Sequence, residues 1–273
     1  MGLDKKVLVA FNGMRGAYAE QACKATRQDA ITVPCSSVEE VFEKVANRSA
    51  AYGVVPIENC IAGSVSENYD LLLKYCTEQN VRIVREICLR ITHCLLASPR
   101  ATLQSIKRVY AHPQALAQCR PFLDVRNYLP IPMNDNGSAA AMVGLHGRID
   151  EAAIAGIDAA RNYRLNILGK DIAARNYNAT RFLIIGKKQN EKIDSGKFSI
   201  AFRCAHKPGA LHACLATLKK MNLTSIASRP TQDFGMYRFF VDFEGHHANK
   251  SIQNLQRKAE ELCILGKYYT QYA

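Results

Sequence analysis

Several features that would identify a membrane, metal-binding or nucleotide-binding protein are missing from this chain of 273 residues. No apolar run approaches the length needed to span a membrane. The ten cysteines include no C-x-x-C pair and no zinc-binding spacing occurs, so we predict no metal ion. Gly13 and Gly16 lie between a predicted strand and a predicted helix. They do not complete a dinucleotide-binding fingerprint, and no P-loop lysine follows them.

The chain also has fewer acidic than basic residues, with 24 Asp and Glu against 36 Lys and Arg, which gives a formal net charge of +12. The basic residues are spread along the chain, whereas nucleic-acid-binding proteins usually concentrate them on one face or helix. We therefore expect a small anionic ligand and no nucleic acid. The first predicted strand begins at Val7 and leaves no room for a signal peptide, so we expect a cytoplasmic protein with reduced, mostly buried cysteines.

The first two thirds of the chain alternate short apolar strands with amphipathic helices, the pattern of an α/β fold. Strands are predicted over 7–11, 51–56, 81–86, 89–96, 106–110, 129–132 and 151–155, and helices over 17–26, 38–45, 68–75, 115–123, 139–145 and 157–163. No helix separates strands 81–86 and 89–96, so we expect the chain to cross there into a second lobe. A second crossing follows the segment 166–168, and two lobes joined in this way would enclose a small-molecule site between them.

A different pattern follows the polar segment from Gln189 to Gly196, which we interpret as a linker. Strands are predicted over 198–202, 223–230, 237–243 and 265–270, a turn over 232–235, and helices over 208–218 and 251–263. The order βαββαβ is that of a ferredoxin-like unit, and we find no catalytic constellation in it. Such a sheet has one bare face, so we expect it to pair with a second copy or to bind a ligand at an edge.

Polar residues gather where predicted strands begin or end. The strand from Ala51 ends at Pro56, and the turn after it would present Glu58, Asn59 and Ser64. Ligands of open α/β sheets bind beyond such strand ends, although a helix cap is the alternative. Arg15 in the first glycine loop is a candidate carboxylate clamp. Thr180 opens an apolar strand, and on spacing alone a β-branched residue that starts a strand is the simpler interpretation.

Five segments together resemble, in order and across nearly the whole chain, the prephenate and arogenate dehydratases with a C-terminal ACT domain. Residues 16–22 are similar to the family's G-[TA]-Y-S-x-x-A loop and residues 55–65 to its P-I-E-N-S-x-x-G-S-V segment. Residues 112–119 match H-P-Q-A-L-x-Q-C and residues 178–182 match N-x-T-R-F. In the tail, 208–211 and 222–230 resemble the G-A-L and E-S-R-P phenylalanine-sensing motifs.

The resemblance implies an α/β fold with a two-lobed, periplasmic-binding-protein-like catalytic domain over residues 1–189 and a ferredoxin-like ACT regulatory domain over 196–273. Lobe one would comprise about 1–86 and 168–189, and lobe two about 87–167. The implied partners are prephenate or arogenate as substrate, phenylalanine as effector, and further copies of the chain in a homodimer or tetramer formed partly through the ACT domain.

The activity that the resemblance implies is decarboxylative dehydration of prephenate to phenylpyruvate in phenylalanine biosynthesis, with feedback by phenylalanine. Aromatisation drives this reaction, so no cofactor is required. One alternative is an arogenate dehydratase that makes phenylalanine directly. Another is a ligand-sensing protein that has kept the cleft and lost catalysis. A third is a prephenate decarboxylase, against which the retained Thr180 argues.

The resemblance also assigns roles to residues. Thr180 would donate a hydrogen bond to the departing hydroxyl, and Glu58 is the rival proton source if burial raises its pKa. The expected substrate contacts are Arg15, Asn59, Cys60, Ser64, His112, Gln118, Arg181 and Phe182. The expected effector contacts are Gly209, Ala210, Leu211, His212, Asn222, Leu223, Thr224, Ser228 and Arg229.

Six positions depart from the family pattern. Ala19, Cys60 and Ala111 stand where the family has serine, and Asn136 stands where threonine is common. These losses of hydroxyl groups bear on substrate choice and turnover. In the tail, Ala227 replaces the glutamate of E-S-R-P, and His212 stands where an apolar residue is usual. These two changes bear on the response to phenylalanine.

Overall fold

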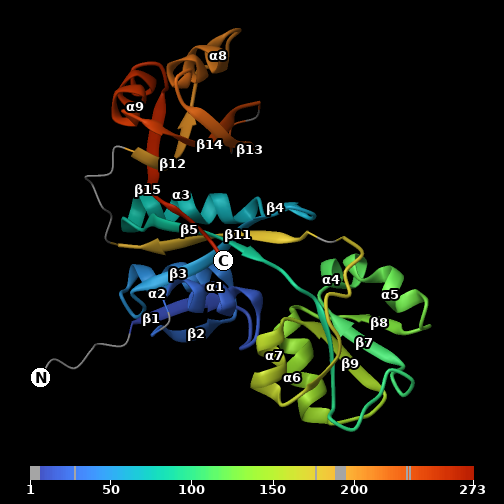
Figure 1. The fold of residues 1–273 in the computed structure, drawn as a ribbon. Coiled ribbons are helices and arrows are strands. Elements are labelled where there is room, and N and C mark those ends of the chain that lie inside the picture. The colour runs from blue at the N-terminus through green and yellow to red at the C-terminus, as the bar shows by residue number, and fades with distance from the viewer. Residues whose placement is uncertain (1–6, 28, 176, 188–194, 232, 234) are drawn as a thin grey trace, which may run out of the picture.

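Two β-sheets organise the residues that the computed structural model describes, which are 7–27, 29–175, 177–187, 195–231, 233 and 235–273 (Figure 1). The larger sheet has the order β13-β14-β12-β15-β5-β11-β3-β1-β2, and the smaller has the order β10-β6-β9-β7-β8. Together with the helices on their faces they form a mixed α/β fold, as the alternation of strands and helices predicts.

The first lobe is built on one half of the larger sheet. Its strands are β1 (Leu8–Asn12), β2 (Ile31–Cys35), β3 (Tyr52–Asn59), β5 (Arg82–Arg90) and β11 (Ala179–Gly186), and the short β4 (Gly63–Ser64) pairs with β3. Helix α1 (Tyr18–Thr26) covers one face, and α2 (Val38–Ala46) and α3 (Glu67–Gln79) cover the other. Helix α2 begins as its sequence predicts, since Ser37 accepts a hydrogen bond from the N–H of Glu40 at 3.1 Å.

The second lobe is built on the smaller sheet and lies beside the first (Figure 1). It contains β6 (Cys94–Ala97), β7 (Arg108–Ala111), β8 (Leu129–Pro132), β9 (Glu151–Ala155), β10 (Asn166–Gly169), α4 (Pro113–Gln118), α5 (Arg120–Asp124), α6 (Asn136–His146) and α7 (Ile157–Tyr163). The two segments that connect the lobes run side by side, because the N–H of Ile91 donates to the carbonyl of Asn178 at 2.8 Å. The two expected crossings are therefore adjacent in space.

The C-terminal unit follows the expected order, with β12 (Ser195–Arg203), α8 (Ala210–Leu215), the 3₁₀ turn η1 (Ala216–Leu218), β13 (Asn222–Pro230), β14 (Tyr237–His246), α9 (Ala248–Gln256) and β15 (Glu261–Tyr268). A last strand, β16 (Thr270–Tyr272), pairs with β5 of the first lobe. The linker expected from Gln189 to Gly196 lies outside the described residues except for its last two positions. Positions 232 and 234 of the expected turn lie outside them as well.

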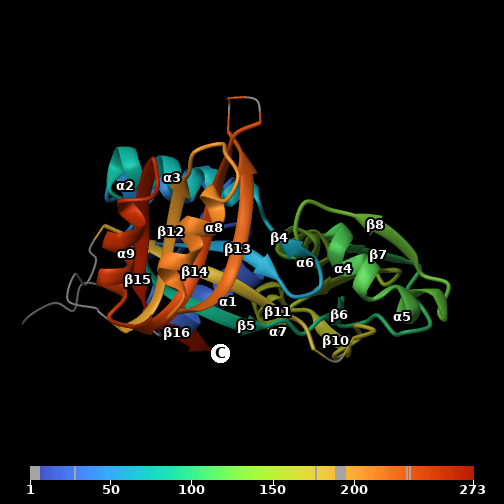
Figure 2. The ribbon, with the colours of Figure 1, turned by 90° about the horizontal axis from the view of Figure 1, so that it is seen from above.

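The sheet of the C-terminal unit does not have the bare face that is expected from the sequence, because both of its faces are covered. One face of its sheet is covered by α8 and α9, and the other packs on α3 (Figure 2). On the α3 side, the rings of Tyr69 and Phe240 lie 4.9 Å apart. At the sheet junction, Gly266 of β15 pairs with Ile83 of β5. A Cβ at Gly266 would lie 2.4 Å from the Ile83 carbonyl oxygen, so this approach requires glycine.

Several predicted boundaries are wrong. Strand β3 continues through Glu58 to Asn59 because it pairs there with β11, and β5 is one strand from Arg82 to Arg90, so the first crossing starts after residue 90 and not at 87. The helix expected over 115–123 is two short helices, because Pro121 has no N–H to donate. The helix expected over 251–263 ends at Gln256, and residues 261–263 belong to β15, which pairs with β12.

In the described part of the chain, no helix is long and apolar enough to cross a membrane.

Candidate active site

Thr180 lies at the start of β11, opposite Asn59 on the neighbouring strand β3. The next pair in the same register is Arg181 opposite Glu58. Because successive side chains of a strand point to opposite faces, Thr180 and Asn59 share the face covered by α1, whereas Arg181 and Glu58 share the face covered by α3. Both Thr180 and Asn59 are partly buried.

The amide of Asn59 has a defined orientation. Its Oδ1 accepts hydrogen bonds from the backbone N–H groups of Ile61 and Ala62, both at 3.0 Å. A backbone N–H can only donate, so the NH₂ group of Asn59 must face the other way. There it donates to Thr180 Oγ1 at 2.9 Å and to Asn178 Oδ1 at 2.7 Å. Because Thr180 Oγ1 accepts this bond, its own proton is left to be donated elsewhere.

The same chain of hydrogen bonds continues into the second lobe. Asn178 Nδ2 donates to Gln118 Oε1 at 2.8 Å, and His93 Nε2 lies 2.8 Å from the same oxygen. His93 must therefore carry its proton on Nε2, and its Nδ1 accepts from the Tyr18 hydroxyl at 2.7 Å. We call these six residues the interlobe network: Tyr18, Asn59, His93, Gln118, Asn178 and Thr180.

The interlobe network holds the two lobes in register at the candidate site. Tyr18 begins α1 of the first lobe and Gln118 ends α4 of the second. His93 and Asn178 belong to the two crossing segments and are each 3% exposed. Buried polar groups are costly unless every partner is present, so a connected network of this kind fixes the side-chain positions around Thr180.

Burial keeps the centre of the network neutral. Desolvation lowers the pKa of His93 below its ordinary value, against the hydrogen bond to Gln118 and the charge of Asp171, which raise it. Desolvation also raises the pKa of Tyr18 well above 10. Neutral imidazole with its proton on Nε2 is the form that the hydrogen-bond directions require.

This lowered pKa predicts a pH dependence of stability. Between the folded pKa of His93 and its unfolded value of about 6.5, the unfolded chain binds more protons than the folded one. The contribution of His93 is therefore complete above about pH 6.5 and is lost as the pH falls through that value. We expect the free energy of unfolding, measured with urea between pH 7.5 and 5.5, to decrease toward low pH.

In the variant His93→Gln, the free energy of unfolding should decrease less steeply between pH 7.5 and 5.5. His112→Gln is the matched control, because the pKa of His112 is also lowered by desolvation but its ring is only partly buried, so it should reduce the slope by less. An unchanged slope in His93→Gln would show that this imidazole does not titrate with folding.

The remaining first-lobe candidates lie around the β3–β4 hairpin and the glycine loop. Cys60 is exposed, and its Sγ accepts a hydrogen bond from the N–H of Ala179 at 3.1 Å. Ser64 is exposed on β4, opposite Glu58. Arg15 is exposed, and its backbone carbonyl accepts from the hydroxyl of Tyr163 in the second lobe at 2.7 Å.

His112 caps helix α4 in the second lobe. Its ring Nδ1 accepts a hydrogen bond from the backbone N–H of Gln114 at 3.2 Å, and the backbone N–H of His112 donates to Asn136 Oδ1 at 2.9 Å. The loop 13–16 of the first lobe meets the second lobe closely, since a Cβ at Gly16 would lie 2.8 Å from Ala159. Arg15 and His112 thus sit on segments that flank the contact between the lobes.

Three expected site residues are not available beside Thr180, which corrects the sequence-based placement: two lie on the other face of the sheet and one is buried in the core. Glu58 and Arg181 lie on the opposite face of the sheet, and the Arg181 Nε is 3.4 Å from a Glu58 oxygen. Phe182 is on the same side as Thr180 but is 3% exposed within the core under α1. The physical reason is that β3 does not end at Pro56, so strand alternation directs Glu58 and Asn59 to opposite faces.

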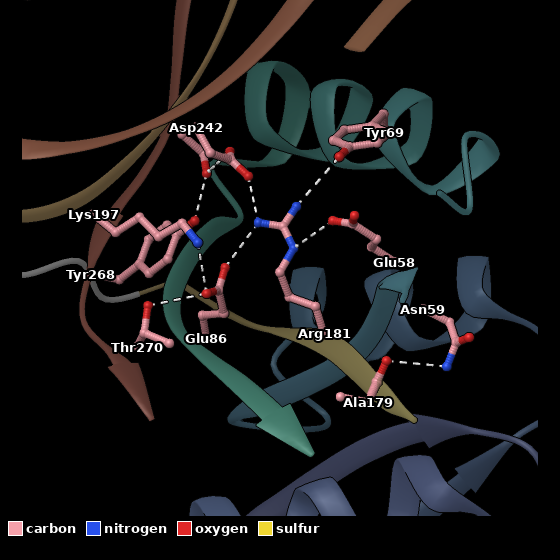
Figure 3. Close-up of polar contacts among 11 residues, drawn as sticks. Glu58, Asn59, Tyr69, Glu86, Ala179, Arg181, Lys197, Asp242, Tyr268 and Thr270 are labelled. Carbon is pink, nitrogen blue, oxygen red and sulfur yellow. Dashed lines mark hydrogen bonds and ion pairs between the residues drawn. The ribbon is translucent and has the colours of Figure 1, made fainter. Parts of the chain in front are cut away.

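Arg181 is the centre of a buried ionic cluster (Figure 3). Its Nη1 lies 2.5 Å from Asp242 of β14 and 3.0 Å from Glu86 of β5. Glu86 also accepts from Lys197 of β12 at 2.8 Å. Burial disfavours the charged form of Arg181, but the carboxylates of Asp242 and Glu86 raise its pKa above the ordinary value. Two cations thus face two buried carboxylates, and the cluster joins β11 to the C-terminal unit.

The expected effector residues lie at both ends of β13. Gly209, Ala210, Leu211 and His212 begin α8, near the end of the sheet where Pro230 of β13 pairs with Tyr237, whereas Asn222, Leu223 and Thr224 begin β13 at the other end. Ser228 is exposed. Arg229 differs from expectation, because its guanidinium contacts Asp70 of α3 at 2.5 Å.

The sequence patterns did not identify three members of the interlobe network as site residues, namely Tyr18, His93 and Asn178. Tyr18 and Asn178 lie inside the motifs that carry the family resemblance, next to residues that received roles. His93 lies inside the segment 89–96 that is predicted from the sequence as one strand, and a histidine within this apolar segment is the signal that could have identified it. In the described ranges, no cluster of three or more His, Cys, Asp or Glu could hold a metal ion.

Comparisons with known proteins agree with this geometry. The sequence model of the family described as prephenate dehydratase matches residues 9–190. The arogenate dehydratase/prephenate dehydratase 2, chloroplastic, of Arabidopsis thaliana is 38% identical over 284 aligned residues, which cover 96% of this chain and 73% of that protein.

Two solved structures are also similar over nearly the whole chain. One is GqqA, described as a novel type of quorum quenching acylase, with 31% identity, a TM-score of 0.89, and coverage of 97% of this chain and 98% of GqqA. The other is a prephenate dehydratase from Arthrobacter aurescens in complex with L-Phe, with 31% identity, a TM-score of 0.86, and coverage of 96% of this chain and 90% of that one. Their equal identity means that the fold alone does not choose between the two described activities.

Proposed function

Because the chain belongs to the prephenate dehydratase family, a family of carbon–oxygen lyases, we propose that it converts prephenate to phenylpyruvate with loss of CO₂ and water. The bond to the ring carboxylate breaks, its electrons enter the ring, and the ring hydroxyl leaves with a proton as water. The observation that supports this activity is the orientation of Thr180, whose oxygen accepts from Asn59 and whose proton is thereby available to the leaving group.

Thr180 would act as a hydrogen-bond donor and not as an acid that ionises first. A threonine hydroxyl is a weak acid, so its proton transfers only as negative charge develops on the departing oxygen. Asn59 increases its effect because it fixes the position of Oγ1 before the substrate binds. Glu58 lies on the opposite face of the β3–β11 pair and does not enter this proposal as the proton source.

Substrate binding would use the groups that surround Thr180 from both lobes. Gln118 Oε1 accepts two hydrogen bonds within the network, which turns the NH₂ group of Gln118 outward as a donor. Arg15 supplies a guanidinium for the side-chain carboxylate of the substrate. A weaker hold on the ring carboxylate favours decarboxylation, because tight binding of that group would stabilise the ground state.

An ultraviolet assay of prephenate with the purified protein tests this function. Formation of the aromatic keto acid, phenylpyruvate, supports the dehydratase. Release of CO₂ without an aromatic product would identify a decarboxylase. Binding of prephenate without conversion would identify a ligand-sensing protein. Either result would overturn the proposal. Arogenate assayed in parallel compares kcat/KM for the keto and amino substrates, and we propose prephenate as the better one.

We further propose that residues 1–189 carry the reaction in the cytoplasm and that 196–273 form a regulatory ACT domain that binds phenylalanine between two copies. Strand β13 lies at one edge of the larger sheet. Two of its apolar side chains are exposed to solvent, Leu223 at 40% and Ile226 at 53%. Its two ends are roughly 25 Å apart at about 3.3 Å per residue. Antiparallel pairing of two β13 edges would bring Gly209 and Leu211 of one copy to Asn222 and Thr224 of the other.

Phenylalanine should therefore bind with a stoichiometry of one per chain and raise the temperature of unfolding. The Asn222→Ala variant should bind more weakly, because Asn222 lies at the proposed contact, whereas Asn254→Ala on α9 is the matched control. Isothermal titration calorimetry measures the binding directly. A flat titration with the intact chain would remove the effector from the account and leave the dehydratase activity to be tested separately.

A further inference from the structure

A pair of cysteines joins the first lobe to the C-terminal unit at a distance from the candidate active site. Cys76 lies on α3 and Cys263 on β15, and their sulfur atoms are 3.1 Å apart. Cys76 is 1% exposed, whereas Cys263 is partly exposed and lines a cavity of about 550 Å³ beside α3. An oxidant of small size therefore has access to one sulfur of the pair.

The charges around the pair favour one reactive thiolate. The pKa of Cys263 is lowered to about 7 by the hydrogen bond with Cys76 and by the positive charges of Arg82 and Arg238, which outweigh the effect of burial. The pKa of Cys76 is raised, first by the same hydrogen bond and then by burial. Arg82 also contacts the Cys76 sulfur directly. Cys263 is the sulfur that lines the cavity, so it is the nucleophile, and the buried Cys76 is the thiol that donates to it.

The other cysteines do not combine these features. Cys60 is exposed, and its sulfur contacts the backbone N–H of Ala179. Cys204 and Cys214 of the C-terminal unit are both buried, and burial raises the pKa of each. A hydrogen bond joins Cys204 to Cys214, so they form a second cysteine pair in the same chain that lacks a low-pKa thiol and serves as an internal control.

We propose that Cys76 and Cys263 are a reversible redox pair that closes a disulfide between α3 and β15. A hydroperoxide is the oxidant: the Cys263 thiolate attacks one oxygen of hydrogen peroxide, the O–O bond breaks, and the second oxygen leaves as water after protonation. The resulting sulfenic acid is attacked by Cys76, which forms the S–S bond and releases a second water. Two thiols are oxidised and one peroxide is reduced, and a dithiol reductant restores both cysteine thiols by thiol–disulfide exchange, in which it is itself oxidised to a disulfide.

The geometry requires only a small movement for this reaction. A disulfide has a sulfur separation of about 2.05 Å, so the two sulfurs must approach by roughly 1 Å. The bond would link positions 187 residues apart and would fix the C-terminal unit on α3. This inference concerns a surface between two parts of the chain and does not depend on the proposed activity.

The test is oxidation of the reduced full-length protein with stoichiometric hydrogen peroxide, followed by alkylation, proteolysis and mass spectrometry. We expect a cross-linked peptide that contains Cys76 and Cys263, its loss on treatment with dithiothreitol, and a rise in Tm of at least about 5 °C for the oxidised protein. Alkylation of both thiols after oxidation, or a cross-link at Cys204 and Cys214 in their place, would overturn the proposal.

Single substitutions distinguish the nucleophilic thiolate, Cys263, from the resolving thiol, Cys76. In Cys76→Ser the sulfenic acid of Cys263 has no resolving thiol, so dimedone should label it. In Cys263→Ser, Cys76 should resist oxidation, because the nucleophile is gone. Cys204→Ser is the control and should form the cross-link like the unchanged protein. A Cys263 that resists dimedone in the first variant would also contradict the proposal.

Discussion

Thr180→Ala is expected to lower kcat for prephenate by a factor of about a hundred or more, which is the scale of a positioned proton donor. At room temperature this factor corresponds to about 2.7 kcal/mol of lost transition-state stabilisation. The substitution removes the oxygen that accepts from Asn59 at 2.9 Å, and with it the only atom of the side chain that can donate to the leaving hydroxyl. KM should change little, because the hydroxyl acts mainly in the transition state.

Two controls make this result specific. Thr180→Ser keeps the hydroxyl and should retain most of the activity, whereas Thr180→Val keeps the shape and should behave like the alanine variant. All three proteins should unfold within a few degrees of the unchanged chain, since Thr180 is only partly buried. An alanine variant with near-normal kcat would remove Thr180 from the mechanism.

Asp242→Ala is expected to cost about 3–5 kcal/mol of the free energy of unfolding, the range measured when one partner of a buried ion pair is removed. Asp242 is 6% exposed and contacts Arg181 at 2.5 Å. Its loss leaves two buried cations, Arg181 and Lys197, opposite the single buried carboxylate of Glu86. The cost arises from this uncompensated charge and not from the pair itself, whose net contribution is small.

The matched control for this prediction is an exposed ion pair between the same two parts of the molecule. Asp70 of α3 contacts Arg229 of β13 at 2.5 Å, but its side chain is 55% exposed. Asp70→Ala should cost at most about 1 kcal/mol, because solvent screens the pair. Urea unfolding of both variants measures the difference. Equal costs would show that the loss of Asp242 does not leave an uncompensated buried charge.

The ionic cluster also gives the C-terminal unit a physical connection to the candidate active site. Arg181 follows Thr180 directly on β11, so its side chain lies on the opposite face of the same strand. Asp242 and Lys197 come from β14 and β12 of the C-terminal unit (Figure 3). A movement of that unit would therefore change the contacts of a residue adjacent to Thr180.

The sequence predicted most of the elements, because the relevant patterns are local. Strand β9, from Glu151 to Ala155, has the bounds that its apolar run predicts. The capping residues at the start of α2 are likewise visible in four consecutive positions. Where the information is local, propensity and pattern agree with the structure.

What could not be predicted depends on contacts between distant segments. The extension of β3 through Glu58 is determined by its pairing with β11, more than a hundred positions later, and it decides on which face Glu58 lies. The role of His93 depends on Tyr18 and Gln118 meeting at one crossing segment. The junction of the two sheets depends on Gly266 reaching Ile83, which no local pattern contains.

The most direct test of the account is a crystal structure of the Thr180→Ala variant with prephenate bound. We expect the ligand on the face of β11 that carries position 180, with its ring hydroxyl directed at the vacated Oγ1 site and within hydrogen-bond reach of Gln118 from the other lobe. A ligand bound instead on the face of Arg181, or away from both crossing segments, would contradict it.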